Sequence, residues 1–163
     1  MIVVAFGANL GSAAGAPMAT LQAALAHFEK LAIDVLAVSR FYRTPAWPDP
    51  SEPPFVNGVA CVRTELPPAL LLQTLHEIEA DFGRVRSRPN APRTLDLDLI
   101  DYNGIVVNDM LVLPHPRLTE RAFVLVPLFD IAPDWCHPVS GTAIGTLLAR
   151  LPEADRQAVV PLN

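Results

Sequence analysis

The sequence predicts an α+β fold with an antiparallel β-sheet, and two observations support this prediction. Apolar segments with the alternation or β-branched content of strands are interleaved with two segments that carry apolar residues at helical spacing. The chain has 163 residues, of which 51% are hydrophobic and 18% are charged. This length and composition suit one domain with a substantial core, so we expect a single domain over residues 1–163.

The first half of the chain predicts the order strand, helix, strand, strand, over residues 2–7, 17–30, 33–42 and 55–64. The glycine-flanked segment 7–11 predicts a turn after the first strand. Pro17 suits the first position of the helix, and apolar residues such as Leu21 and Phe28 form its buried stripe. The segment 44–54 contains five prolines, which exclude a helix or a central strand, so we expect a binding loop or a stiff connector.

The second half continues with a helix and a strand. The helix is expected from Pro68 to about Phe82, and the strand lies in the run that ends at Ile100. Asn103-Gly104 predicts a hairpin turn that pairs this strand with residues 105–107. Further helices are expected from near Thr119 and over 142–151. The order through Asp101 is therefore βαββαβ, which predicts a ferredoxin-like sandwich with an added hairpin strand and C-terminal helices.

Composition narrows the class of partner. The net charge of −5 argues against a general nucleic-acid binder, which needs a basic face. No apolar stretch is long enough to span a membrane, and the first residues lack the basic region of a signal peptide. Cys61 and Cys136 have no metal-ligand spacing, which suits a reducing compartment. We expect a cytoplasmic monomer that binds neither nucleic acid nor membrane.

The run Arg93-Thr94-Leu95-Asp96-Leu97-Asp98-Leu99-Ile100 is the most informative segment. On a strand, alternation places the leucines on one side and Asp96 and Asp98 on the other. Adjacent carboxylates suit a hard cation such as Mg²⁺, which prefers oxygen ligands. The alternative, which these residues alone favour, is an ordinary solvated face.

Basic residues are unevenly distributed. Lys30 is the only lysine among 12 basic residues, and four arginines lie within ten positions: Arg84, Arg86, Arg88 and Arg93. The planar guanidinium suits bidentate recognition of phosphate. The cluster predicts a site for a small polyanion or, alternatively, a solvated basic loop.

Several other side chains are candidates for ligand binding. Phe55 and Asn57 share one face of a strand, and a ring beside an amide suits a flat heterocycle, although both could be structural. Phe123 could supply the opposite ring face or belong to the core. His115 lies between two prolines in a rigid turn, where a phosphate contact is possible.

The run Ala91–Ile100 resembles the signature of the 6-hydroxymethyl-7,8-dihydropterin pyrophosphokinases of folate biosynthesis. Other segments agree in order and spacing, so that the resemblance covers nearly the whole chain. These segments are Gly7-Ala8-Asn9-Leu10, Phe41-Tyr42-Arg43-Thr44-Pro45, Phe55-Val56-Asn57, Gly83-Arg84-Val85-Arg86, Pro114-His115, Arg121-Ala122-Phe123 and Pro127-Leu128-Phe129-Asp130-Ile131-Ala132-Pro133.

The resemblance implies an enzyme that transfers pyrophosphate from ATP to the hydroxymethyl group of the pterin and releases AMP. It implies that Asp96 and Asp98 bind two Mg²⁺ ions. The implied catalytic residues are Arg84, Arg93, Asp96 and Asp98. The implied nucleotide-binding residues are Glu79, Arg84, Arg93, His115 and Arg121. The implied pterin-binding residues are Thr44, Trp47, Phe55, Asn57 and Phe123, with the two rings of Phe55 and Phe123 stacking on the pterin.

Two alternatives remain open. One is another Mg²⁺-dependent nucleotide transferase that shares the aspartate pair but lacks a pterin pocket. The other is a non-catalytic ferredoxin-like module that binds RNA or a small regulator. The sequence pI of about 5.2 speaks against RNA.

Overall fold

A computed structural model describes residues 1–47, 49–85 and 91–162. Its main sheet contains β1 (Ile2–Ala8), β2 (Asp34–Val38), β3 (Tyr42–Thr44), β4 (Phe55–Arg63), β5 (Asp96–Tyr102) and β8 (Val160–Pro161). A small second sheet contains β6 (Val107–Asn108) and β7 (Val112–Leu113). The helices are α1 (Pro17–Phe28), α2 (Pro68–Asp81), α3 (Ala122–Ile131), α4 (Ile144–Arg150) and α5 (Glu153–Gln157), with 3-10 turns at Glu29–Leu31 and Leu118–Glu120.

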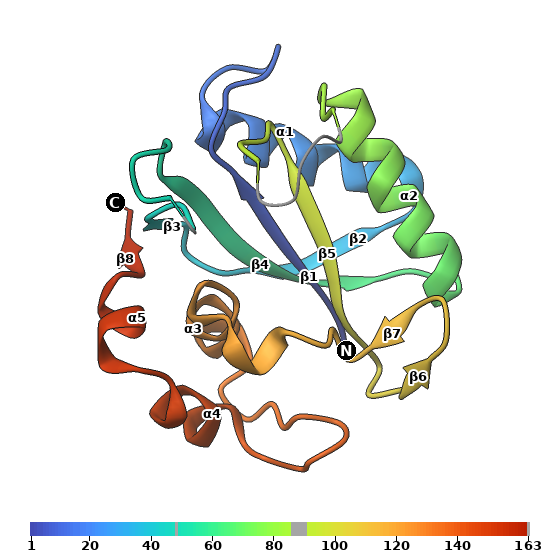
Figure 1. The fold of residues 1–163 in the computed structure, drawn as a ribbon. Helices are drawn as coiled ribbons and strands as arrows, with labels where there is room; N and C mark the ends of the chain where they lie inside the picture. Colours follow the sequence, from blue (N-terminus) through green and yellow to red (C-terminus); the bar gives the residue numbers. More distant parts are fainter. Residues whose placement is uncertain (48, 86–90, 163) are drawn as a thin grey trace.

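The main sheet has the order β5-β1-β4-β3-β8, and β2 pairs with the other end of β4 (Figure 1). Each of these pairings is antiparallel. Strands β1 and β4 lie in the centre of the sheet and β5 lies at one edge, as the βαββαβ order predicts. The ferredoxin-like α+β fold is therefore confirmed.

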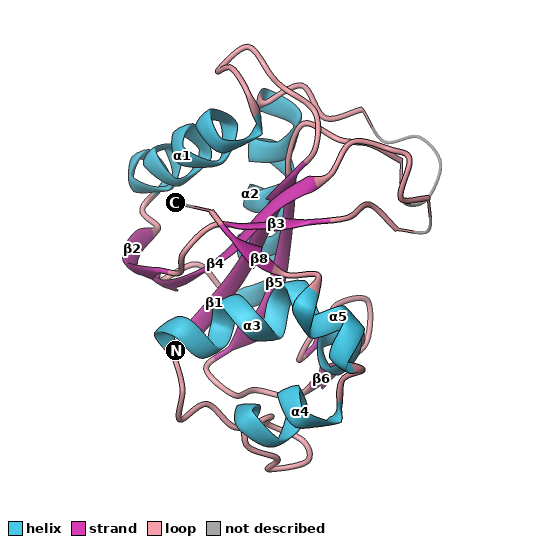
Figure 2. Cartoon of the chain, turned by 90° about the vertical axis from the view of Figure 1, so that its left-hand side faces the viewer, coloured by secondary structure: helices cyan, strands magenta, loops and turns pink. Residues whose placement is uncertain are grey.

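The sheet separates two apolar cores. Helices lie on both of its faces (Figure 2). Helices α1 and α2 cover one face, where Val4 and Phe6 of β1 pack with Leu21 and Leu75. Helices α3, α4 and α5 lie on the other side, where Val3 and Ala5 of β1 join the α3 core. Alternate residues of β1 therefore pack into opposite cores, as expected of a central strand buried on both faces.

One predicted strand and one predicted turn need correction. The segment 33–42 is not one strand, because β2 ends at Val38 and β3 begins at Tyr42. Between them, the Ser39 backbone N–H donates to the carbonyl of Val59, and the Ser39 hydroxyl accepts the Val59 N–H. This side-chain bond replaces one rung of the ladder, so pairing with β4 is interrupted there. Gly7 belongs to strand β1 and not to the predicted turn.

The hairpin at Asn103-Gly104 is confirmed as a turn, with φ values of 52° and 72°. The predicted pairing of residues 105–107 with β5 is wrong. Val107 and Asn108 pair instead with β7 in the separate small sheet. Val107 packs against the α1/α2 core and Leu113 is buried in it, so apolar burial directs the segment away from the sheet edge. The strand added to the main sheet is β8, which pairs with β3.

Among the described residues, no helix combines the length and the apolar character that crossing a bilayer requires. Cys61 is buried and Cys136 is exposed, and neither forms a disulfide.

Candidate active site

The candidate site lies on the face of the sheet that α3 covers, just beyond the start of that helix. Strand pairing places Gly7 of β1 between Asn57 of β4 and Asp96 of β5. Ala5, two residues earlier on β1, belongs to the α3 core, so alternation assigns Gly7 to the same face. The neighbouring strands therefore bring residues distant in sequence to one surface.

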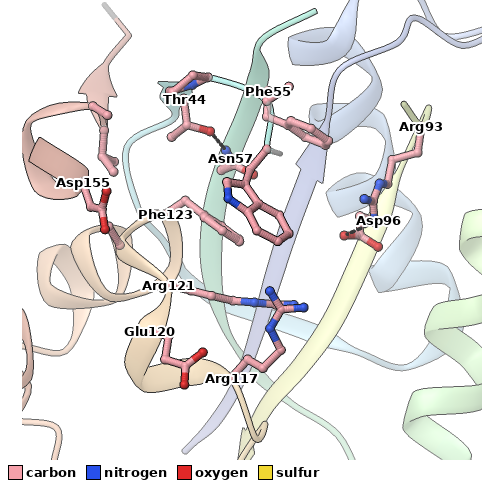
Figure 3. Close-up of a pocket in the computed structure, with 16 residues that line it drawn as sticks. Thr44, Phe55, Asn57, Arg93, Asp96, Arg117, Glu120, Arg121, Phe123 and Asp155 are labelled. Atoms are coloured by element: carbon pink, nitrogen blue, oxygen red, sulfur yellow. Dashed lines mark hydrogen bonds and ion pairs between the residues drawn. The ribbon is translucent and has the colours of Figure 1, made fainter. Parts of the chain in front are cut away.

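A pocket of about 450 Å³ opens on this surface (Figure 3). The strands contribute its floor, the proline-rich loop contributes one wall, and the start of α3 contributes another. Helix α5 and the residues that follow it contribute the remaining part of the pocket lining. Its lining consists of Thr44, Pro45, Ala46, Trp47, Phe55, Asn57, Arg93, Asp96, Arg117, Glu120, Arg121, Ala122, Phe123, Asp155, Ala158 and Val159.

The aspartate strand has the predicted two-sided character. Leu95, Leu97 and Leu99 are at most 3% exposed and belong to the α1/α2 core. The side chains of Asp96 and Asp98 retain 27% and 33% of their exposure on the opposite face. Packing of the leucines therefore orients both carboxylates toward the α3 side.

Three guanidinium groups neutralise these two carboxylates. Arg84 and Arg93 donate to different oxygens of Asp96, Arg93 over 3.0 Å. Arg121 donates from Nη1 to Oδ2 of Asp98 over 2.8 Å. The site thus places three guanidinium groups around a carboxylate pair, and guanidinium groups are suited to binding anionic phosphate groups.

Glu79 holds the side chain of Arg84 in place, and Glu79 itself is only 2% exposed. Glu79 Oε1 accepts from Arg84 Nη1 over 2.8 Å and from the backbone N–H of Leu97 over 2.8 Å. Burial lowers the pKa of Arg84, but the carboxylates of Asp96 and Glu79 outweigh it and raise that pKa above the ordinary value. Arg84 therefore stays charged, and Glu79 ties it to both α2 and β5.

Two arginines link the carboxylates to the aromatic wall. Arg93 lies 5.5 Å over the ring of Phe55, and Arg121 lies 5.5 Å over the ring of Phe123. Such stacking restrains a long guanidinium side chain and leaves its edge free to donate. The Nε of Arg121 is buried without an acceptor among the described residues, which is unusual for a charged donor.

The amide of Asn57 is held in a defined orientation. Its Nδ2 donates to Oγ1 of Thr44 over 2.7 Å, and both residues are buried. Nearby, Trp47 remains 66% exposed, and Arg117 lies 6.0 Å from its ring centroid. A planar aromatic wall and an oriented amide are the groups that recognise a flat, polar-edged heterocycle.

His115, which the sequence predicted as a phosphate contact, lies outside the pocket lining. Its Nδ1 accepts the backbone N–H of Arg117 over 3.1 Å. Burial lowers its pKa, Asp98 raises it, and Arg121 and Arg117 lower it further, with a net lowering. The ring is therefore neutral at pH 7, and the proton resides on Nε2, which can donate a hydrogen bond.

Comparison with known proteins agrees with this geometry. Residues 3–133 match the family model of 7,8-dihydro-6-hydroxymethylpterin-pyrophosphokinase. The chain is 42% identical over 162 residues to a 2-amino-4-hydroxy-6-hydroxymethyldihydropteridine pyrophosphokinase of Synechocystis sp., covering 98% of this chain and 79% of that one. The chain belongs to the 7,8-dihydro-6-hydroxymethylpterin-pyrophosphokinase family.

Another enzyme of the same name, from Methylorubrum extorquens, is 44% identical over 145 residues, covering 88% of this chain and 90% of the relative. Among solved structures, wild-type HPPK-DHPS of Plasmodium falciparum has a TM-score of 0.70 at 16% identity. That alignment covers 91% of this chain and 40% of the Plasmodium chain, so it supports the fold of the pyrophosphokinase part.

The pocket unites most of the residues that the sequence predicted for this family's reaction. All of the predicted pterin-side residues line it, namely Thr44, Trp47, Phe55, Asn57 and Phe123. Arg93, Asp96 and Arg121 line it as well. Arg84, Asp98, Glu79 and His115 lie outside the lining: Arg84 and Asp98 bond directly to lining residues, and Glu79 is reached through Arg84. Arg86 and Arg88 lie outside the described residues.

Sequence reasoning missed the lining residues Arg117, Glu120 and Asp155. Arg117 and Glu120 could have been found from their position between His115 and Arg121. Asp155 had no such signal, because it reaches the pocket through the short helix α5.

Proposed function

We propose that this protein transfers pyrophosphate from ATP to the hydroxymethyl oxygen of 6-hydroxymethyl-7,8-dihydropterin and releases AMP, as a step of folate biosynthesis. The observation that carries the proposal is the pocket itself. An aromatic and amide wall adjoins an arginine and carboxylate wall within one cavity of about 450 Å³. This pairing suits a flat heterocycle whose reactive arm meets a polyphosphate.

The pterin half consists of Phe55, Phe123, Asn57 and the Thr44–Trp47 segment. The two rings supply apolar faces for stacking, and the Asn57 amide offers a donor and an acceptor to the edge of the heterocycle. Because Thr44 already holds Nδ2, the amide needs little reorganisation when the ligand binds. Backbone groups of Thr44 and Trp47 are expected to complete the edge.

The phosphate half consists of Arg84, Arg93, Arg121 and His115. Transfer of a pyrophosphoryl group requires in-line positioning and neutralisation of charge more than covalent help from the protein. Arg84 and Arg93 meet the charge that grows on the phosphate oxygens in the transition state. Arg121 and neutral His115 supply further donors on the nucleotide side, and Glu79 holds Arg84 in place.

Asp96 and Asp98 would hold the two Mg²⁺ ions. Their carboxylates are hard oxygen ligands on one face of strand β5. This fits Mg²⁺, which commonly takes one or two carboxylates and completes its shell with water and substrate phosphate. When bound, the ions neutralise and orient the phosphate oxygens.

The reaction is tested by incubating the protein with ATP, Mg²⁺ and 6-hydroxymethyl-7,8-dihydropterin and separating the nucleotides. We expect AMP and the pterin diphosphate in equal amounts, no AMP without the pterin, and loss of turnover with EDTA that excess Mg²⁺ restores. ADP as the main product, or AMP formed equally without pterin, would contradict the proposal. A fluorescence titration with the pterin separates it from a nucleotide transferase that lacks a pterin site.

A further inference from the structure

Gly7 lies on β1 between two residues that line the pocket. Its register partners are Asn57 on one side and Asp96 on the other, and both of these line the pocket. Gly7 therefore lies between the amide assigned to the pterin and the carboxylate assigned to the phosphates. Figure 3 shows the side chains of Asn57 and Asp96 approaching the pocket from opposite sides of the β1 ribbon.

The space above Gly7 is already filled by Asn57. A Cβ atom at position 7 would lie 2.6 Å from Oδ1 of Asn57 and 3.7 Å from the carbonyl oxygen of Val56. Gly7 lies in regular strand β1 and is not among the glycines with positive φ. The need for glycine here therefore comes from close approach to a side chain and not from backbone conformation.

Both polar atoms of the Asn57 amide therefore have a defined neighbour. Thr44 accepts from Nδ2 over 2.7 Å, and the bare Cα of Gly7 admits Oδ1. The bond to Thr44 therefore orients the amide, and the absence of a side chain at position 7 leaves room for that orientation.

We propose that Gly7 is a positioning residue for pterin recognition, because its missing side chain allows Asn57 to hold its amide in the binding orientation. The proposal rests on the proposed function and adds a residue that touches neither reacting group. Oδ1 is the end of a rotatable side chain, so a methyl group at position 7 displaces the amide more easily than it displaces a strand. Gly7→Ala should therefore fold, turn Asn57 away and break its bond to Thr44.

The test compares Gly7→Ala, Asn57→Ala and the double variant. The readout is the dissociation constant of 6-hydroxymethyl-7,8-dihydropterin, measured by fluorescence with a non-hydrolysable ATP analogue and Mg²⁺ present. We expect each single variant to weaken pterin binding by about tenfold, the effect of losing roughly one oriented hydrogen bond to a ligand. The double variant should be no weaker than Asn57→Ala, because Gly7 acts only through Asn57. Affinity for the ATP analogue should stay unchanged.

The outcomes separate this inference from the proposed function. If Asn57→Ala weakens pterin binding and Gly7→Ala does not, the inference is wrong and the proposed function stands. A double variant that loses the sum of both effects also overturns the inference, since Gly7 would then act independently. If neither single variant affects pterin binding, the role of Asn57 in the proposed function fails as well.

Two further variants control for general damage, and a third tests the contact with Thr44. Gly145→Ala, on α4 with nothing within 4 Å of the added Cβ, should leave binding unchanged and should not lower thermal stability, because alanine favours a helix more than glycine does. Gly58→Ala would place its Cβ 2.4 Å from the ring of Phe6, so it reports damage to the α1/α2 core. Thr44→Val removes the other anchor of the amide without adding bulk to β1. It should weaken pterin binding even if Gly7→Ala does not fold, and unchanged binding would contradict the two-anchor arrangement.

Discussion

Arg121 donates a hydrogen bond of 2.8 Å to Asp98, and the same guanidinium lies 5.5 Å over the ring of Phe123. On the other side of the pocket, Arg93 connects Asp96 with the ring of Phe55 in the same way. Each arginine therefore joins the half of the pocket assigned to phosphate with the half assigned to the pterin. Binding of one substrate is expected to alter the contacts that receive the other.

The first prediction concerns the carboxylates. Asp96→Ala and Asp98→Ala should each reduce the turnover number by about a thousandfold or more, because they remove charge stabilisation worth several kcal/mol. Both side chains are partly exposed, so the free energy of unfolding should change by about 1 kcal/mol or less. AMP release and urea denaturation measure the two effects. Full activity of either variant at ordinary Mg²⁺ would exclude the two-carboxylate model.

The second prediction separates Arg84 from Arg93. Both Arg→Ala variants should slow transfer more than they weaken pterin binding. Arg84→Ala should also cost about 3 kcal/mol of stability, because it removes a largely buried cation that pairs with the Glu79 carboxylate. Arg93→Ala, at a more exposed pair, should cost about 1 kcal/mol or less.

Urea denaturation of these variants measures the difference. Arg63→Ala is a suitable control, because Arg63 pairs with Asp34 at the surface with side-chain exposures of 68% and 57%. Equal stability of the Arg84 and Arg93 variants would show that Glu79 does not depend on Arg84.

The third prediction tests the aromatic wall. Phe55→Ala and Phe123→Ala should each weaken pterin binding by about tenfold or more, since stacking of a heterocycle on an aromatic ring contributes about 1–3 kcal/mol. Phe129→Ala is the matched control, because Phe129 lies on α3 with 43% exposure, close to the 37% of Phe123, but does not line the pocket. If Phe129→Ala and Phe123→Ala weakened binding equally, the effect would belong to α3 and not to stacking.

The fourth prediction concerns stability at high pH. Tyr42 donates from Oη to Asp130 over 2.7 Å, which ties β3 to α3. Burial, together with the bond to Asp130, raises the pKa of Tyr42 from 10.0 to about 12. The folded state thus holds the proton more tightly, so its contribution is complete below pH 10 and is lost as the pH rises toward 12.

The measurement is urea denaturation between pH 8 and pH 12, compared with Tyr42→Phe. The variant should be about 1 kcal/mol less stable near pH 8, because it lacks one hydrogen bond, and the difference should shrink as the pH rises. Tyr102→Phe, which retains Tyr42, should keep the alkaline loss of the unmodified protein. A constant difference between the Tyr42→Phe variant and the parent across this range would contradict the assignment to Tyr42.

Local patterns were sufficient to predict much of the fold. The leucine–aspartate alternation predicted the two faces of β5. Apolar spacing predicted both α1 and α2, and in α1 it predicted the buried residues Leu21 and Phe28. Local patterns failed where a contact between residues distant in sequence determines the local structure. The Ser39–Val59 bonds divide one predicted strand, and burial of Leu113 takes the segment after Gly104 out of the predicted hairpin.

The residue types of the site were determined by the sequence alone: paired carboxylates, clustered arginines, and aromatic and amide side chains on predicted strands. Their arrangement was decided by the tertiary structure, because antiparallel register places residues far apart in sequence side by side. Register sets Gly7 between Asn57 and Asp96, and packing of α2 under β5 makes Glu79 the buried support of Arg84. The roles of Gly7 and Glu79 therefore depend on neighbours that only the tertiary structure supplies.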